Sequence, residues 1–326
     1  MSKTKIKIIP YIGYGHKNKI YCRGRIIENE NIKISQKDSI LNTLINSYKR
    51  VETDEIPHQK FKVKFGTFEQ EFKTNSEGYY LILGTLNDFT PSKPFEKFEV
   101  CIDKENYKKD WSKAAISKKG KILFPSETAK FGIISDIDDT ILQTDVLSTL
   151  KWKIFYNTLF IKASDRMPIK HANIWYQKLK GKDDKNPNPF FYVSNSPWNL
   201  YDYLQDFLKL NKFPEGVVLL RDFGRNKKDR LQAYSKHKFY EVENILKMYP
   251  KMEFLLIGDG GEKDALIYLK LKKLYPKQVK AIFIHRLGDK KHQSKIEKIA
   301  KDHEEYFFFV KNADEGIEIS KKLGLV

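Results

Sequence analysis

The chain of 326 residues carries 60 Lys and Arg against 42 Asp and Glu, which gives a formal net charge of +18 at pH 7. Hydrophobic residues make up 40% and aromatic residues 13% of it, enough to bury the core of one large or two modest domains. Its two cysteines, Cys22 and Cys101, are too few for a disulfide framework and lack the spacing of a zinc site. The composition therefore excludes a disulfide-stapled peptide and a disordered chain, and it predicts a folded protein with reduced cysteines.

The charge and the hydropathy of the chain limit the kinds of partner that we expect for it. No apolar run approaches the ~18 residues that span a bilayer, and the first ten residues lack the apolar core of a signal peptide. We therefore expect a cytoplasmic protein, or one that sits on a membrane surface. The positive charge favours an anionic partner such as phospholipid, nucleic acid or a phosphorylated metabolite. Three of the eight arginines, Arg221, Arg225 and Arg230, fall in one ten-residue segment.

Residues 1–125 alternate or cluster β-forming residues between turn-like segments, which predicts a mainly-β, sandwich-like accessory domain. The expected strands are 5–12, 19–27, 60–73, 79–83 and 98–102. One helix is expected over 38–51. The run Lys118-Lys119-Gly120-Lys121, followed by Pro125, is interpreted as the boundary region of this domain.

Residues 126–326 change to short apolar strands that alternate with helical patterns, which is typical of parallel βαβ units. Buried parallel strands should be mainly apolar, and six segments are: 131–135, 190–193, 217–220, 254–257, 279–284 and 306–310. The expected helices are 141–161, 169–180, 198–210, 240–249, 263–274 and 314–323. The second domain is therefore expected to be an α/β fold around a parallel sheet.

Three carboxylates stand within four residues directly after the first apolar strand, in Asp136-Ile137-Asp138-Asp139-Thr140. Like charges this close repel one another, so the cluster is tolerable where a divalent cation and phosphate-binding donors neutralise it. The alternative is an acidic turn that caps the next helix, but one Asp would suffice for a cap. We interpret this strand exit as a site for a cation and a phosphate.

Two further strand ends carry polar groups, and each alone is an ordinary helix cap. Ser194 and Asn195 follow the second strand, and Asp259 and Asp264 lie five residues apart in the glycine-rich turn after the fourth. Open α/β sheets bind their ligands at the carboxyl ends of the strands. Polar residues that follow three strands at that edge of the sheet therefore predict one shared site.

Together these motifs resemble those of the haloacid dehalogenase superfamily and, within it, the catalytic domain of the actin-patch-protein type phosphatidate phosphatases. The matching segments are Ser135 to Ile141, Tyr192 to Leu200, Phe213 to Gly216 and Leu256 to Asp264. The resemblance covers about residues 130–287 and implies a Rossmann-like parallel sheet of haloacid dehalogenase type. Gly260 departs from the pattern, in which a serine follows the Asp of the metal loop.

The resemblance implies a role for each residue at the first two strand ends. Asp136 is the expected nucleophile, which attacks phosphorus to form an aspartyl-phosphate. Asp138 is the expected general acid that protonates the leaving alcohol, and later the base that activates water. Ser194 would hydrogen-bond a phosphoryl oxygen, and Thr140 would support the loop.

The same resemblance implies a Mg²⁺ ion as cofactor. Its expected ligands are Asp136, the Asp138 backbone carbonyl and Asp259, with Asp264 orienting or ligating. A hard, all-oxygen ligand set of this kind suits Mg²⁺.

A lysine is a further expected catalytic residue, and three more residues are assigned to the substrate. Lys238 fits the spacing of the family's motif lysine, with Lys236 as the alternative. Asn195, Arg221 and Arg225 are expected to bind the substrate phosphate.

The predicted function is a Mg²⁺-dependent phosphomonoesterase that converts phosphatidate to diacylglycerol and phosphate. A phosphatase for nucleotides, nucleic-acid ends or soluble phospho-metabolites is one alternative, and a non-catalytic lipid- or protein-binding module is another. The intact Asp136, Asp138, Ser194 and Asp259 argue against the second alternative. The sequence contains no recognised nucleic-acid-binding motif, which disfavours nucleic acid as a partner.

An anionic membrane surface is a further expected partner. The segment from Arg221 to Lys238 holds seven basic residues against two acidic ones, and it is expected to be a basic loop over the phosphate pocket. The stretch 146–161 is rich in Trp, Phe and Leu, although core packing is an equal alternative for it. Trp152 and Phe155, with the loop, are predicted to form a membrane-facing rim.

Overall fold

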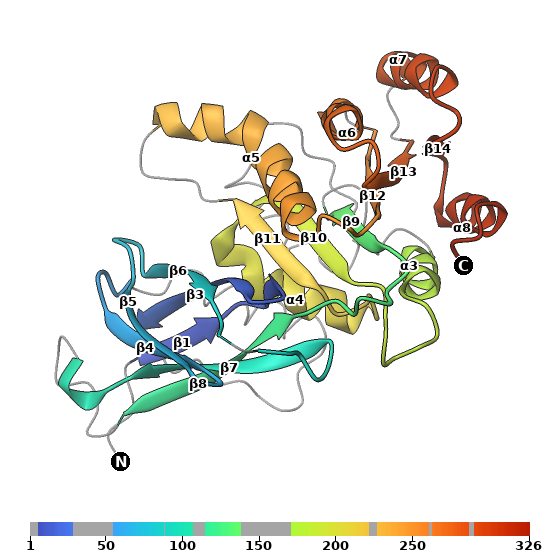
Figure 1. The fold of residues 1–326 in the computed structure, drawn as a ribbon. Coiled ribbons are helices and arrows are strands. Elements are labelled where there is room, and N and C mark those ends of the chain that lie inside the picture. Colours follow the sequence, from blue (N-terminus) through green and yellow to red (C-terminus); the bar gives the residue numbers. More distant parts are fainter. Residues whose placement is uncertain are drawn as a thin grey trace. The chain divides into compact units, whose positions relative to one another are not determined.

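A computed structural model describes most of the chain (Figure 1). The described residues are 6–28, 55–87, 89–106, 115–137, 171–221, 227–260, 263–286 and 290–326. The chain divides into two compact units at Glu127 and Thr128, called the first and second unit below. The helices expected over 38–51 and 141–161 lie outside the described residues.

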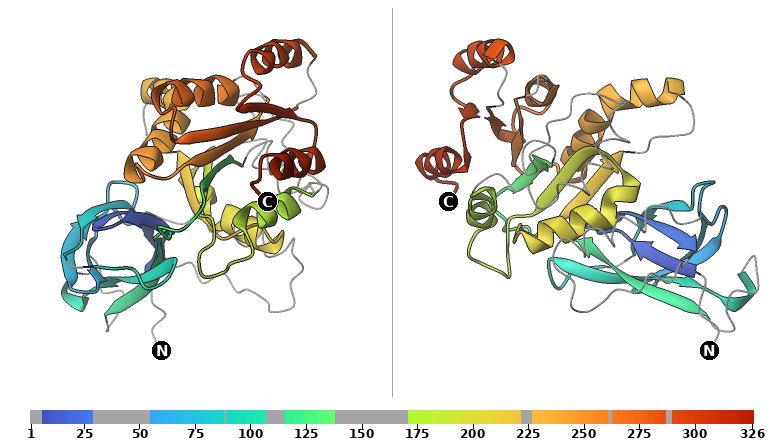
Figure 2. Two further views of the ribbon diagram at one scale, coloured as in Figure 1. Left: turned by 45° about the vertical axis from the view of Figure 1, so that its right-hand side comes forward. Right: turned by 180° about the vertical axis from the view of Figure 1, so that it is seen from behind.

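The first unit is mainly β, as predicted. Its described elements are β1 (Ile6–Pro10), β2 (Gly13–His16), β3 (Lys19–Glu28), β4 (Lys60–Phe65), β5 (Phe68–Lys73), β6 (Tyr79–Thr85), β7 (Phe95–Ile102), the 3₁₀ helix η2 (Lys104–Asn106) and β8 (Ile116–Leu123). Hydrogen bonds join them into one sheet in the order β1-β3-β2-β8-β7-β4-β5, with β6 paired to β3. The sheet curls into a ring, seen end-on in the left view of Figure 2, whereas a sandwich consists of two separate sheets.

Two segments of the first unit differ from their predictions. The stretch 60–73 forms a hairpin of β4 and β5, because Gly66 adopts a left-handed φ of 57° that turns the chain. The lysine-rich run at 118–121 lies inside β8, and the two units divide after this strand, between Glu127 and Thr128. Gly120 belongs there because a Cβ at this position would stand 2.4 Å from a ring carbon of Phe98 on the neighbouring strand.

The second unit alternates strands and helices. Its described elements are β9 (Gly132–Asp136), α3 (Ala172–Lys180), β10 (Phe190–Pro197), η3 (Trp198–Leu200), α4 (Tyr201–Leu210), β11 (Val217–Arg221), α5 (Lys227–Met248), β12 (Phe254–Asp259), α6 (Lys263–Leu274), β13 (Val279–His285), α7 (Lys290–Lys301), β14 (Phe307–Val310) and α8 (Ala313–Lys322). All six predicted strands are confirmed. They pair in parallel in the order β11-β10-β9-β12-β13-β14.

This strand order determines where a ligand can reach the sheet. If the six strands from β9 to β14 are numbered 1 to 6 in chain order, their order across the sheet is 3-2-1-4-5-6. The direction in which successive strands are added therefore reverses between the neighbouring strands β9 and β12. Connections on the two sides of such a reversal leave opposite faces of the sheet, which opens a crevice beyond the carboxyl ends of those two strands. Asp136 ends β9 and Asp259 ends β12, at this position.

The helices cover both faces of the sheet. Consecutive strand residues point to opposite faces, and the ring of Phe190 packs on Tyr176 of α3 while that of Phe191 packs on Tyr249, just after α5. Phe213 extends the first contact toward α4. Figures 1 and 2 accordingly show α5 and α6 over one face and α3 and α4 over the other.

Two helices of the second unit differ from the sequence-based expectation. Helix α5 begins at Lys227, so the prediction of a loop from Arg221 to Lys238 is wrong for residues 227–238. The first half of α5 is polar, which left no apolar stripe to indicate a helix. Helix α7 was not predicted. No helix within the described ranges is long and apolar enough to span a membrane.

Candidate active site

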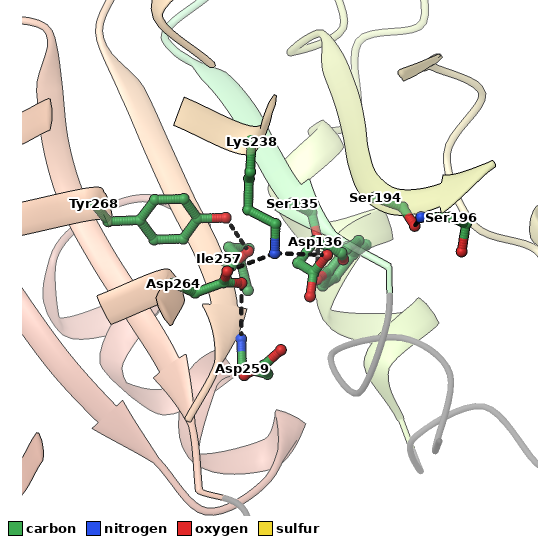
Figure 3. A network of polar contacts seen from close by, with 10 residues as sticks. Ser135, Asp136, Ser194, Ser196, Lys238, Ile257, Asp259, Asp264 and Tyr268 are labelled. Atoms are coloured by element: carbon green, nitrogen blue, oxygen red, sulfur yellow. Dashed lines mark hydrogen bonds and ion pairs between the residues drawn. The ribbon is translucent and has the colours of Figure 1, made fainter. Parts of the chain in front are cut away.

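The centre of the site is the Asp136 carboxylate at the end of β9. Nζ of Lys238, from α5, lies 3.0 Å from Oδ1 of Asp136 and 2.5 Å from Oδ1 of Asp264, from α6 (Figure 3). The side chains of these residues are at most 5% exposed. Three segments that lie far apart in the sequence thus bring one cation and two carboxylates together out of contact with bulk water.

Lys238 balances the charge of this buried cluster. Burial by itself lowers the pKa of an ammonium group, because the charged form loses its hydration. The carboxylates of Asp136 and Asp264 outweigh that effect and raise the pKa of Lys238 well above its usual value. Lys238 therefore stays protonated and places a positive charge beside the carboxylates of Asp136 and Asp264.

Asp259 adds a third carboxylate. One carboxylate oxygen from each of Asp136, Asp259 and Asp264 lies within 4.8 Å of the other two. The backbone N–H of Asp259 also donates to Oδ2 of Asp264, at 3.4 Å. Three carboxylates against one ammonium leave an excess of negative charge, and all the donor atoms are oxygens. The cluster therefore fits a hard divalent cation such as Mg²⁺.

The end of β12, which carries Asp259, is shaped by a glycine and a tyrosine. A Cβ on Gly258 would stand 2.6 Å from Oδ2 of Asp264 and 2.8 Å from the ring of Tyr268, so the strand end needs glycine here. The hydroxyl of Tyr268 donates to the carbonyl of Ile257 at 3.3 Å, which ties α6 to the end of β12. Tyr268 was not singled out from the sequence, where its only signal is its position one helical turn after Asp264.

A hydrogen-bonded chain supports Asp136 from the opposite face of the sheet. Oγ of Ser135 donates to the backbone carbonyl of Asp136 at 2.7 Å, and the hydroxyl of Tyr176 lies 2.7 Å from the same Oγ. Since the serine has one hydrogen to donate, the Tyr176 hydroxyl must be the donor to it. Burial raises the pKa of Tyr176, so this hydroxyl keeps its proton. Sequence reasoning missed both residues.

The neighbouring strand ends contribute the other predicted polar residues. Ser194 on β10 is fully buried, and its Oγ accepts from the backbone N–H of Ser196 at 2.9 Å (Figure 3). Oδ1 of Asn195 is buried and makes no hydrogen bond to the described residues. Arg221, the last residue of β11, is only 2% exposed and pairs in register with Pro197 of β10. Serine and arginine therefore stand at the same carboxyl edge as Asp136.

The structure distinguishes the two candidate lysines but does not describe every predicted residue. Lys238 faces the carboxylates, whereas Lys236 lies exposed on the same helix. Asp138, Thr140 and Arg225 lie outside the described residues, as do Trp152 and Phe155 of the predicted rim.

Residues 131–286 match the family model described as "Phosphatidate phosphatase APP1, catalytic domain". These residues form a domain of this family. The resemblance of the motifs to the catalytic domain of these phosphatidate phosphatases is thereby confirmed. The matched range begins one residue before β9 and ends one residue after β13, and it contains every site residue described above.

Two fungal relatives extend the likeness beyond the catalytic domain. "Phosphatidate phosphatase APP1" of Saccharomyces cerevisiae is 30% identical over 260 residues, which cover 76% of this chain and 41% of that protein. An uncharacterized protein of Schizosaccharomyces pombe is 26% identical over 233 residues, 71% of this chain and 36% of that protein. The chain thus spans less than half the length of these curated relatives. Among solved structures, a carbohydrate acetylesterase from Xanthomonas citri aligns over 93% of this chain and 68% of that chain, with a TM-score of only 0.29 and 9% identity.

Proposed function

We propose that the chain is a Mg²⁺-dependent phosphomonoesterase of haloacid dehalogenase type, which converts phosphatidate to diacylglycerol and phosphate. The observation that carries the proposal is the buried Asp136 carboxylate, held by Lys238 and grouped with Asp259 and Asp264 where β9 and β12 diverge. The match of residues 131–286 and the 3-2-1-4-5-6 strand order support it. The name of the yeast relative supports phosphatidate as the substrate.

Asp136, Asp259, Asp264 and the backbone carbonyl of Asp138 are the proposed Mg²⁺ ligands. The charge of the ion would offset the repulsion between the Asp136 carboxylate and the phosphate oxygens. Ser194 and Lys238 are proposed to bind phosphoryl oxygens, with Thr140 supporting the loop.

The proposed reaction has two displacement steps at phosphorus. In the first, a carboxylate oxygen of Asp136 attacks phosphorus, the bond from phosphorus to the glycerol oxygen breaks, and Asp138 gives its proton to that oxygen. In the second, Asp138 takes a proton from water, whose oxygen attacks the phosphorus of the aspartyl-phosphate. Inorganic phosphate leaves, and Asp136 is restored as a carboxylate.

Substrate recognition is assigned to the edge of β10 and β11. Arg221, which is buried at the end of β11, and Asn195, which follows Ser194 on β10, stand at the same carboxyl edge, where a phosphate at Asp136 would need further donors. Arg225 is proposed to join them. Since the substrate lies in a bilayer, the proposal places the protein in the cytoplasm with reversible contact to anionic membrane surfaces.

The test is an assay of the pure protein with Mg²⁺ against phosphatidate in detergent micelles, nucleotides and phospho-sugars. We expect phosphate and diacylglycerol to be released from phosphatidate in equal amounts, and EDTA to stop the reaction. Hydrolysis of nucleotides or phospho-sugars alone would show that the substrate is a soluble phosphomonoester. No hydrolysis of any substrate, with folding intact, would favour the non-catalytic binding module.

A further inference from the structure

The most exposed large apolar side chains of the second unit's described residues stand on α5 and α6. Tyr240 is 51% exposed, Leu266 is 51% exposed and Leu274 is 54% exposed. Elsewhere among the described residues of this unit the highest value is 47%, at Ile174. Exposed apolar side chains are common singly, but these three lie on two helices that pack against each other.

Helix α6 is apolar on two sides. Ala265, Tyr268 and Leu271 face the sheet and are fully buried, while Leu266 and Leu274 face away from it. A helix that only packs on a sheet needs a single apolar stripe, with polar residues on its other side. The second set of leucines is therefore available to another surface.

Lysines surround this second apolar set. Lys236, Lys270 and Lys273 are exposed on the same two helices. Nζ of Lys270 lies 4.7 Å from the ring centroid of Phe239, which connects the outward side of α6 to that of α5. We define the α5–α6 surface as Lys236, Tyr240, Leu266, Lys270, Lys273 and Leu274.

The charge of this surface is not balanced by the acid beside it. Glu243 of α5 is half-buried, forms an ion pair with Lys247 at 2.9 Å, and accepts a hydrogen bond from Tyr275 at 2.9 Å. These partners hold the pKa of Glu243 below its ordinary value. The α5–α6 surface therefore presents leucine and tyrosine side chains among positive charges.

The α5–α6 surface also adjoins the site. Tyr240 stands two positions after Lys238 on α5, and Leu266 stands two positions after Asp264 on α6. Residues two apart on a helix point to nearly opposite sides. The same two helical turns thus hold the catalytic cluster on their inner side and the exposed apolar residues on their outer side.

We infer that the α5–α6 surface docks on an anionic lipid bilayer, with the leucines in the acyl boundary and the lysines at the phosphate headgroups. The inference rests on the proposed function, because phosphatidate supplies both the acyl chains and the negative charge. A two-fold contact between copies of the chain would instead place lysines opposite lysines, which opposes association. The bilayer is the occupant that matches both the charge and the apolar character of the surface.

The test is co-sedimentation of the full chain with vesicles of phosphatidylcholine, alone or mixed with phosphatidate or phosphatidylserine. The test variant is Leu266→Gln with Lys270→Gln, one turn apart on α6. The matched control is Ile174→Gln with Lys178→Gln, which are exposed and one turn apart on α3, over the opposite face of the sheet. Loss of one leucine and one lysine contact should lower binding to both anionic vesicles about tenfold. The control variant should bind as the wild type does, and added salt should weaken binding.

Three results would overturn the docking surface. The first is that the α6 variant binds the anionic vesicles as well as the wild type does, and the second is that the wild type does not bind them at all. The third is that the wild type is a dimer in sedimentation velocity while the α6 variant is a monomer. Phosphate release from detergent-dispersed phosphatidate is measured on the same preparations. Its absence would count against the proposed function, whereas equal vesicle binding with that activity intact would count against the surface alone.

Discussion

The lysine–carboxylate pairs on β4 of the first unit and the lysine–carboxylate cluster at the end of β9 in the second unit lie in opposite environments. The pairs on β4 of the first unit are Lys60–Glu71 at 3.4 Å, Lys62–Asp103 at 2.8 Å and Lys64–Glu69 at 3.6 Å. Their side chains are 38% to 52% exposed, whereas those of Lys238, Asp136 and Asp264 are at most 5% exposed. The same chemical groups thus meet in water on one sheet and in the protein interior beside the other.

The two environments give the pairs different effects on the stability of the fold. An exposed pair gains little, because water and salt screen it and two long side chains must be held in place. A buried cluster loses the hydration of every charge, and that cost often exceeds the mutual attraction of the groups. The exposed pairs of β4 therefore need no purpose beyond solubility, while the proposed reaction gives a reason for the cost of the buried cluster.

The sharpest test of this comparison is Asp136→Asn. The amide keeps the shape of the carboxylate but cannot attack phosphorus, so kcat should fall by at least about a thousandfold while the fold is retained. Phosphate release and circular dichroism measure the two parts. Activity above that level in a folded variant would show that Asp136 is not the nucleophile.

The second test replaces one lysine of the buried cluster and one lysine of the exposed pairs. Lys238→Met leaves two carboxylates buried without their cation, which should destabilise the protein by about 3–5 kcal/mol and lower kcat by at least about a hundredfold. Lys62→Met, the matched control on β4, should leave urea unfolding and activity unchanged. If both variants unfold at the same urea concentration as the wild type, the contrast between the two environments has no energetic consequence.

The third test concerns the metal. Asp259→Ala removes one oxygen ligand, so the Mg²⁺ concentration at half-maximal activity should rise about tenfold or more, and isothermal titration without substrate should show weaker Mg²⁺ binding. Asp103→Ala, an exposed acid of the first unit, serves as the control and should change neither value. A wild-type Mg²⁺ midpoint in Asp259→Ala would remove this residue from the metal site.

The parallel sheet could be predicted from the sequence because its strands are buried on both faces. Segments such as 217–220 and 254–257 are continuously apolar, and no other element needs that pattern. Helix α5 was recognised only from Tyr240 onward, since its polar first half has no apolar periodicity. The run 118–121, interpreted as the start of the boundary region, lies inside β8, because lysines on the solvent side of a strand have the composition of a loop.

The candidate site was predictable where its residues follow a strand end. Asp136, Asp259 and Asp264 stand out because acidic groups at that position are costly without a ligand. Ser135 and Tyr176 gave no such signal, because they come together only when α3 packs on the sheet. Their sequence separation is 41 residues, and both residue types are common in ordinary cores.

The smallest expected effect concerns this pair, and it separates positioning from stability. Tyr176→Phe keeps the ring that packs on Phe190 but removes the hydroxyl that bonds Ser135, so the carbonyl of Asp136 loses part of its support. Tyr192→Phe is the matched control, since it removes an equally buried hydroxyl that donates to Pro214 at 2.8 Å. Each variant should lose about 1–2 kcal/mol of stability.

Only Tyr176→Phe should also lower kcat, several-fold and at unchanged KM, because it alone loosens Asp136, the proposed nucleophile. In the Ser135→Ala background the same change should have no further effect on kcat, since the chain of hydrogen bonds is already broken. Equal kcat values in the Tyr176 and Tyr192 variants, with equal losses of stability, would mean that the hydroxyl chain behind Asp136 supports the fold and not the reaction. A kcat loss confined to Tyr176→Phe would instead show that the buried face behind the strand end is part of the catalytic apparatus, a role that no exposed pair of the first unit can have.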